Sequence, residues 1–409
     1  MLGYLPKIYS ITLNKYILNT DIHNFIKNNI NTDISSLLFK KPLFDSVSNK
    51  ELVEQLIGKK KCEKKLPLWF ETNGIYYPPK LNLEQTSSEE TAAYKASLLG
   101  GKRIVDITGG FGIDAYYFSL QYGEVVHCEL QNWLSEIVQH NALTLGRENL
   151  QFYKGDGLEF LEETNDFFDV IYVDPSRRND AKGKVFMLAD CLPNVPNNLE
   201  LLFSKSDTIM IKTSPILDIS NGLEELKNVA EIHVVALQNE VKELLWILRK
   251  NHTDSIQMKT VNLGGNSPIN FDFNWEEEPT LETSFSAPKK YLYEPNSAIM
   301  KAGAFKSISV QFGLSKLHQH SHLYTSDELV DFPGRVFEIV SILPHSKKVL
   351  KQELGGTKAH ITSRNFPDKP DVFRKKYRVK DGGDVYIFLT TNLAEEKLVI
   401  ITKKVSYVH

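Results

Sequence analysis

Cysteine is scarce in this sequence, and the positions of the three cysteines exclude one class of site. Cys62, Cys128 and Cys191 lie far apart and form no C-x-x-C pair. That spacing argues against a zinc site and indicates a reducing compartment, so we expect a cytoplasmic protein. No predicted helix carries the H-x-x-x-H or H-E-x-x-H spacing of metal sites. His318, His320 and His322 alternate beside a predicted strand, where a solvated loop is the simpler interpretation, and we predict no metal site.

Long apolar runs are absent as well, since no segment approaches the roughly 20 residues that span a bilayer. Lys7 and Lys15 interrupt the segment from Met1 to Leu18, so we expect no signal peptide and no membrane partner. The sequence has no low-complexity tract and no internal repeat. With 409 residues, 42% of them hydrophobic, the chain can bury several cores, and about two to four domains are expected.

Acidic and basic residues nearly balance over the chain but not along it. The formal net charge is −3, yet residues 341–409 carry 14 Lys and Arg against 7 Asp and Glu. A basic end on an acidic body indicates a polyanionic partner held at that end. A solvated basic surface is the alternative that a charge count alone leaves open.

The most informative stretch that is present runs from Ile104 to Asp114. A short apolar run ends in Asp106, three glycines follow within four positions (Gly109, Gly110 and Gly112), and a helical pattern then begins. This order predicts a buried parallel strand, a tight turn and a helix N-terminus, which together can cradle a nucleotide. The pattern D-x-T-G-G-x-G-x-D is not the dinucleotide fingerprint G-x-G-x-x-G. It resembles the first motif of class I S-adenosylmethionine (SAM) methyltransferases; a structural glycine turn is the alternative.

Strand and helix patterns alternate from residue 103 to residue 263, which predicts a parallel sheet covered on both faces. Within it we predict a helix near Glu240–Arg249. A linker is expected over 264–288, followed by a β-α-β-β-α-β order typical of ferredoxin-like folds. The predicted fold class is therefore α/β, a Rossmann-like sheet with additional domains. The predicted domains are a helical domain (1–84), a methyltransferase domain (85–265), a ferredoxin-like domain (275–342) and a THUMP-like domain (343–409).

Four acids close four successive predicted strands: Asp106, Glu129, Asp156 and Asp174. Any one of them is more often a turn residue, but four beside a glycine loop suit a SAM site. Glu129 follows Asp106 by 23 positions, which fits the acid that accepts from ribose hydroxyls. We expect Asp156 to accept from the adenine amino group and Asp106 to face the methionine portion.

The fourth acid begins Asp174-Pro175-Ser176-Arg177-Arg178, which resembles the Asp-Pro-Pro-Tyr site of enzymes that methylate exocyclic amines of bases. Ser176 and Arg177 replace the second proline and the aromatic residue, which puts the target atom in doubt. An arginine plane can also stack on a base; pairing with nearby acids is the alternative. Lys212 ends a later strand and is a candidate substrate contact, although strand-end lysines usually extend into solvent.

The similarity extends to Ser87–Lys95 and Lys358–Tyr386, so the chain resembles class I SAM-dependent methyltransferases with a C-terminal THUMP-like domain. The family implies SAM as cofactor and structured RNA, tRNA or rRNA, as partner. A helix at 87–99 would close over the cofactor in such enzymes; a packing helix is equally consistent. A small-molecule or protein methyltransferase and a catalytically silent RNA-binding protein remain alternatives. The resemblance assigns the cofactor to Asp106, Thr108, Gly109, Gly110, Phe111, Gly112, Asp114, Glu129, Asp156 and Gly157, the substrate to Arg178 and Lys212, and catalysis to Asp174, Pro175 and Arg177.

Overall fold

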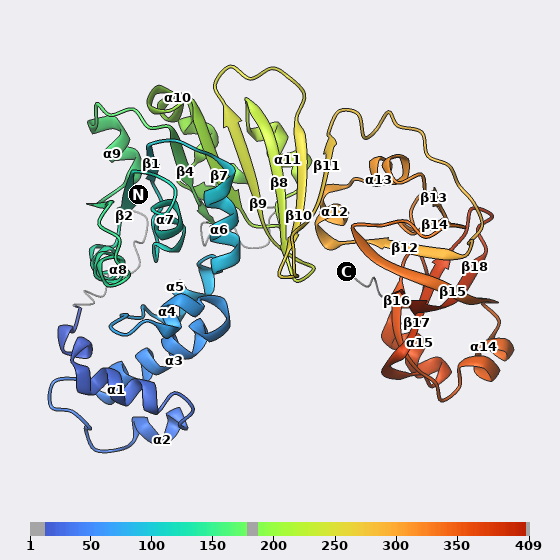
Figure 1. The fold of residues 1–409 in the computed structure, drawn as a ribbon, viewed down its shortest axis with the longest axis horizontal. Helices are drawn as coiled ribbons and strands as arrows, with labels where there is room; N and C mark the ends of the chain where they lie inside the picture. The colour runs from blue at the N-terminus through green and yellow to red at the C-terminus, as the bar shows by residue number, and fades with distance from the viewer. Residues whose placement is uncertain (1–12, 178–186, 406–409) are drawn as a thin grey trace, which may run out of the picture. The chain divides into compact units, whose positions relative to one another are not determined.

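The structure, a computed structural model, describes residues 13–177 and 187–405 of the chain. Contacts between Cα atoms divide it into two compact units (Figure 1). The first comprises the chain up to residue 230 together with 243–253, and the second comprises 231–242 and the chain from 254 onward. No helix of the described ranges is long and apolar enough to cross a membrane.

The first unit begins with short helices. Ser48 caps the longest of them in a capping box, because its hydroxyl accepts from the Glu51 N–H while the Glu51 carboxylate accepts from the Ser48 N–H. The bounds are η1 (Lys15–Leu18), α1 (Thr20–Asn28), α2 (Ile34–Leu38), α3 (Asn49–Lys65), α4 (Pro67–Glu71) and α5 (Lys80–Gln85).

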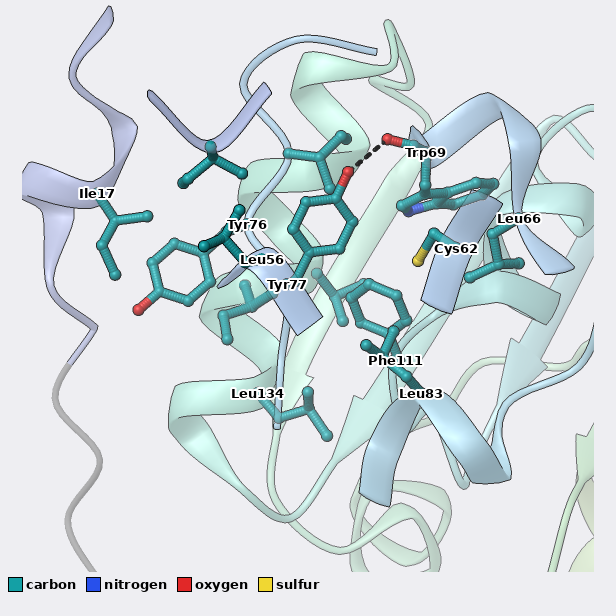
Figure 2. Packing of buried hydrophobic residues seen from close by; sticks show 14 of the residues in the cluster. Ile17, Leu56, Cys62, Leu66, Trp69, Tyr76, Tyr77, Leu83, Phe111 and Leu134 are labelled. Carbon is teal, nitrogen blue, oxygen red and sulfur yellow. Dashed lines mark hydrogen bonds between the residues drawn. The ribbon is translucent and has the colours of Figure 1, made fainter. Parts of the chain in front are cut away.

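These helices share a core with two helices further along the chain, α7 (Ile113–Phe118) and α8 (Asn132–Thr144). Figure 2 shows Trp69 and Tyr77 in this core, where the Tyr77 hydroxyl donates to the Trp69 carbonyl over 2.8 Å. Phe111 and Leu134 pack in the same cluster (Figure 2). Residues 13–85 therefore support the helices that follow the glycine loop and the second strand.

A nine-stranded sheet has the order β11-β10-β8-β9-β7-β4-β1-β2-β3. Strands β7, β4, β1, β2 and β3 pair in parallel, so their carboxyl ends meet at one edge. The remaining elements of this region are α6 (Glu89–Leu98), β1 (Arg103–Asp106), β2 (Glu124–Glu129), β3 (Leu150–Lys154), α9 (Gly157–Glu163), β4 (Val170–Val173), β5 (Ser176–Arg177), η3 (Leu188–Asp190), β6 (Cys191–Leu192), α10 (Val195–Lys205), β7 (Thr208–Thr213), α11 (Ile219–Glu225), β8 (Val229–Leu237), β9 (Glu240–Arg249), β10 (Gln257–Leu263) and β11 (Ile269–Asn274).

The predicted helix near 240–249 is wrong, because this segment is strand β9 and pairs antiparallel with β7. Gln238 and Asn239, between β8 and β9, have φ values of 51° and 63°, as a two-residue hairpin turn requires. Residues 243–248 are all buried, so the apolar run fits an inner strand covered on both faces as well as it fits a helix. Part of the predicted linker is also ordered as strand β11.

The second unit contains a seven-stranded sheet with the order β13-β14-β12-β15-β18-β17-β16. Its elements contain the predicted β-α-β-β-α-β order with two differences: the first helical segment is divided into two at Gly303, which has φ of 77°, and a short strand, β13, is added. The bounds are β12 (Tyr291–Pro295), α12 (Ser297–Ala302), α13 (Ser307–Gln311), β13 (Ser315–Lys316), β14 (Tyr324–Ser326), β15 (Gly334–Pro344), α14 (Lys347–Leu354), β16 (Lys358–Ser363), α15 (Pro370–Tyr377), β17 (Lys380–Thr391) and β18 (Lys397–Lys404).

Candidate functional site

In the glycine loop between β1 and α7, packing excludes a side chain at two glycines and leaves space for one at the third. A Cβ on Gly109 would lie 2.3 Å from Nε2 of His127, and a Cβ on Gly112 would lie 2.3 Å from a methyl carbon of Val138. Gly110 is left-handed, with φ of 56°, and a Cβ there would meet nothing nearer than the Thr108 carbonyl oxygen at 3.8 Å. The open side of the loop at Gly110 is thus where a ligand can approach the backbone.

Asp106 fixes the start of the glycine loop through hydrogen bonds to Thr108. Its Oδ1 accepts from the Thr108 N–H at 2.9 Å and from the Thr108 hydroxyl at 3.2 Å. The side chain is only 1% exposed, and this burial raises the pKa of Asp106 well above its ordinary value, which favours the neutral carboxyl. The Thr108 hydroxyl also accepts from the Asp174 N–H at 2.7 Å, so one side chain ties the ends of β1 and β4 together.

Glu129 and Asp156 occupy the next two strand ends, as predicted, and both orient backbone. Glu129 accepts from the N–H groups of Gly110 at 2.9 Å and Gln131 at 2.8 Å, and burial raises its pKa. The Oδ1 of Asp156 caps α9 by accepting from the Leu158 N–H at 2.7 Å, which leaves its second oxygen for a ligand. Gly157 has a packing reason of its own, since a Cβ would lie 2.3 Å from the Ile107 carbonyl oxygen.

A buried charge network lies beside the loop. The Nζ of Lys95, on α6, donates to both carboxylate oxygens of Glu243 at 2.7 and 2.9 Å and to the Ser87 hydroxyl at 3.0 Å, and it lies 3.3 Å from Oδ1 of Asp114. Asp114 also accepts from the hydroxyls of Tyr172 and Ser87. Burial alone would raise the pKa of Asp114, but the two lysines Lys95 and Lys212 lower it overall. Helix α6 is therefore tied to α7 and β9 by charge.

The network reaches the predicted acceptor site through Lys212, at the end of β7. Its ammonium group forms an ion pair with Oδ2 of Asp174. Burial alone would lower the pKa of Lys212, but the carboxylates of Asp174, Asp114 and Glu243 raise it above its ordinary value. The side chain of Asp174 is 35% exposed, so a carboxylate fixed by lysine still faces solvent at the sheet edge.

The other predicted site residues are placed as follows. Phe111 is buried in the core of Figure 2 and Asp114 in the charge network, so both contribute to packing of the loop and α7. Pro175 is buried, and the backbone of Arg177 in β5 pairs with Cys191 in β6. Arg178 lies outside the described residues. Among the described residues, no cluster of His, Cys, Asp or Glu is arranged to hold a metal ion.

Sequence reasoning missed Glu243 and His127. Glu243 was assigned to a helix and lies 148 positions from Lys95, so no local signal joined them. His127 is 0% exposed beneath Gly109, and burial lowers its pKa to about 4, so the imidazole is neutral at physiological pH. The feature that identifies His127 is the close approach of Gly109 to its ring, and the sequence alone does not show that contact.

The chain resembles known domain families over two segments and a solved structure over nearly its whole length. Residues 291–333 match a ferredoxin-like domain, and residues 334–404 match a THUMP domain-like region. The crystal structure of a candidate methyltransferase from Porphyromonas gingivalis W83 is 33% identical with a TM-score of 0.88, and the match covers 97% of this chain and 100% of that chain. An rRNA methylase from Streptococcus thermophilus is 16% identical with a TM-score of 0.29, over 39% of this chain and 95% of that one, which is too distant to bear on function. No curated protein matches the sequence.

Proposed function

Because the chain belongs to the methyltransferase family with C-terminal ferredoxin-like and THUMP-like domains, we propose that it transfers a methyl group from SAM to a base of structured RNA, tRNA or rRNA. The observation that carries the SAM assignment is the combination of an open, left-handed Gly110 with acids at four adjacent strand ends. The basic excess of residues 341–409 and the THUMP-like match support RNA as the partner.

The residues of the sheet edge fit the cofactor. SAM would supply a sulfonium-bound methyl group, which is a cationic donor with a good leaving group. The open backbone at Gly110 would lie against it, Glu129 would accept from the ribose hydroxyls, and the second oxygen of Asp156 would accept from the adenine amino group. Three acids, Asp114, Glu243 and Asp174, pair with only two lysines beside the loop, and this excess of acidic groups suits a cationic ligand.

Asp174 and the backbone of Pro175 would orient the acceptor amine by accepting its hydrogen bonds. The ion pair with Lys212 fixes the carboxylate in position, so the chain's contribution is orientation of the acceptor. A paired base would have to leave its stack to reach this edge. We further propose that Arg177 and Arg178 contact the RNA, with Arg177 stacking on the base.

Two measurements test the proposal in sequence. Calorimetry with SAM and with its demethylated product tests the cofactor assignment, and absence of binding by both would refute it. Transfer of labelled methyl from SAM to total cellular RNA, followed by nucleoside analysis, tests the acceptor. Label that appears in protein or small molecules and not in RNA would favour another methyltransferase class, and SAM binding without any transfer would favour a silent RNA-binding protein.

Single-turnover rates test the catalytic residues. Asp174→Ala should leave SAM affinity within a few-fold and remove turnover, since the acceptor is oriented in the transition state. Asp207→Ala is the matched control, because Asp207 is 68% exposed at the other end of the parallel strands, just before β7. Wild-type speed in Asp174→Ala would refute the catalytic assignment. Full rescue of Arg177→Ala by Arg177→Lys would refute stacking, because lysine has no planar face.

A further inference from the structure

Two arginines of the second unit share one buried carboxylate. Glu294 lies near the end of β12 and is only 3% exposed. Arg335 faces it directly across the β12–β15 pair, and Arg364 follows the last residue of β16. The site therefore joins the region matched as ferredoxin-like, which contains Glu294, to the region matched as THUMP-like, which contains both arginines.

Both arginines bind Glu294 through the Nε and Nη2 side of the guanidinium group. Arg335 donates from Nε and Nη2 to Oε2, and Arg364 donates from Nε at 3.3 Å and Nη2 at 3.0 Å to Oε1. This leaves the Nη1 edge of each fork directed away from the carboxylate. The side chains are 38% and 36% exposed, so each arginine remains partly open to solvent. One buried acid thus fixes two partly exposed forks.

The charge at this place favours an anion. One carboxylate is set against two guanidinium groups, and within the described ranges neither arginine forms an ion pair with a second acid. A neighbouring hydroxyl can add a donor, since Thr362 Oγ1 lies 3.5 Å from Nη2 of Arg335. Arginine forks held in advance of binding are suited to phosphate oxygens, because little side-chain freedom is lost when the ligand binds.

Two of the three basic residues of α15, Arg374 and Lys376, are already engaged within the unit. Arg374 donates to the carbonyl groups of Ala359 and Lys380 and forms an ion pair with Asp381 at 2.7 Å. Lys376 pairs with Asp368 at 3.0 Å. Their donors serve the unit's own structure, whereas the Arg335–Arg364 pair presents one unused edge each.

We propose that Arg335 and Arg364, held by Glu294, form a clamp for the phosphodiester groups of RNA. The inference rests on the proposed RNA substrate and adds the place where the backbone is gripped. Arg335 lies outside the basic segment 341–409, so the composition of that segment does not point to it.

The test is binding of a fluorescein-labelled RNA hairpin to the full-length protein, followed by anisotropy between about 50 and 200 mM KCl, where phosphate contacts weaken markedly. Arg335→Ala/Arg364→Ala should lose roughly tenfold or more in affinity, and the slope of log Kd against log salt should fall by about 1 for each arginine. Arg335→Lys/Arg364→Lys keeps both charges and a donor for Glu294, but it should also bind more weakly because lysine has no second edge.

Arg374→Ala is the control, since it removes one positive charge from the same unit and should leave RNA affinity within about twofold and the salt slope unchanged. Wild-type affinity and slope in the double alanine variant would overturn the clamp while leaving the proposed function intact. Wild-type affinity in the double lysine variant, which retains both charges, would also overturn it. If the wild-type protein binds inorganic phosphate in calorimetry but no RNA, both the clamp and the RNA part of the proposed function fail.

Discussion

The buried pair of Lys95 and Glu243 makes the most quantitative prediction. The side chains are 0% and 3% exposed, and the ammonium group donates to both carboxylate oxygens at 2.7 and 2.9 Å. Removing Lys95 leaves the buried carboxylates of Glu243 and Asp114 without their shared lysine, which costs about 3–5 kcal/mol. Lys95→Met should therefore destabilise the first unit by that amount, or by roughly 6–20 °C in Tm at 2–4 °C per kcal/mol. Glu243→Met should cost less, because the ammonium group of Lys95 still lies 3.3 Å from Oδ1 of Asp114.

The double variant discriminates a paired charge from a generally sensitive site. Replacing a buried ion pair by apolar side chains of similar volume is often about neutral. Lys95→Met/Glu243→Met should therefore cost less than Lys95→Met alone, since Asp114 keeps its bonds from Tyr172 and Ser87. The coupling free energy of the cycle would then be at least about 1 kcal/mol.

Urea unfolding followed by tryptophan fluorescence provides the assay. Trp69, Trp133 and Trp246 belong to the first unit, and Trp275 is the one tryptophan of the second. Glu54→Met serves as the control, because Glu54 is 49% exposed and its contact with Lys50 spans 4.0 Å, so a change within about 0.5 kcal/mol is expected. The network would be refuted if each single variant cost less than about 1 kcal/mol, as an exposed ion pair does, and if the two costs added in the double variant.

Three further predictions concern the sheet edge. Gly109→Ala should lower the Tm because its Cβ meets His127. Gly110→Ala should cost only about 1 kcal/mol of backbone strain and yet weaken SAM binding. If the two variants had equal Tm values in thermal unfolding and equal SAM affinities in calorimetry, this prediction would be contradicted. The pKa of His127 is lowered from 6.5 to about 4, so the unfolded state binds more protons, and stability should fall by about 3 kcal/mol as the pH drops from 6.5 to 4; urea unfolding should show His127→Leu without that loss. Lys212→Met should leave SAM affinity unchanged and slow single turnover, and an unchanged rate would show that Asp174 acts without its partner.

Much of the first sheet could be predicted because its signals are local. Apolar runs ending in an acid, followed by glycine or a cap, identify each strand end wherever the chain later folds, and β1, β2 and β4 end where Asp106, Glu129 and Asp174 indicated. Segment 240–249 failed because a continuous apolar run fits a buried helix as well as an inner strand. The deciding turn at Gln238 and Asn239 contains no glycine, so its left-handed backbone has no clear sequence signal.

The sequence by itself determined which side chains reach the carboxyl edge of the parallel strands, since strand direction and strand ends follow from the pattern. Only the tertiary structure decided what those side chains do with one another. It engages Asp106 with Thr108, ties Lys212 to Asp174, and completes the lysine network with Glu243 from a distant strand. Such pairings depend on sheet order and burial, and these are set by contacts between residues far apart in the chain, which no local pattern encodes.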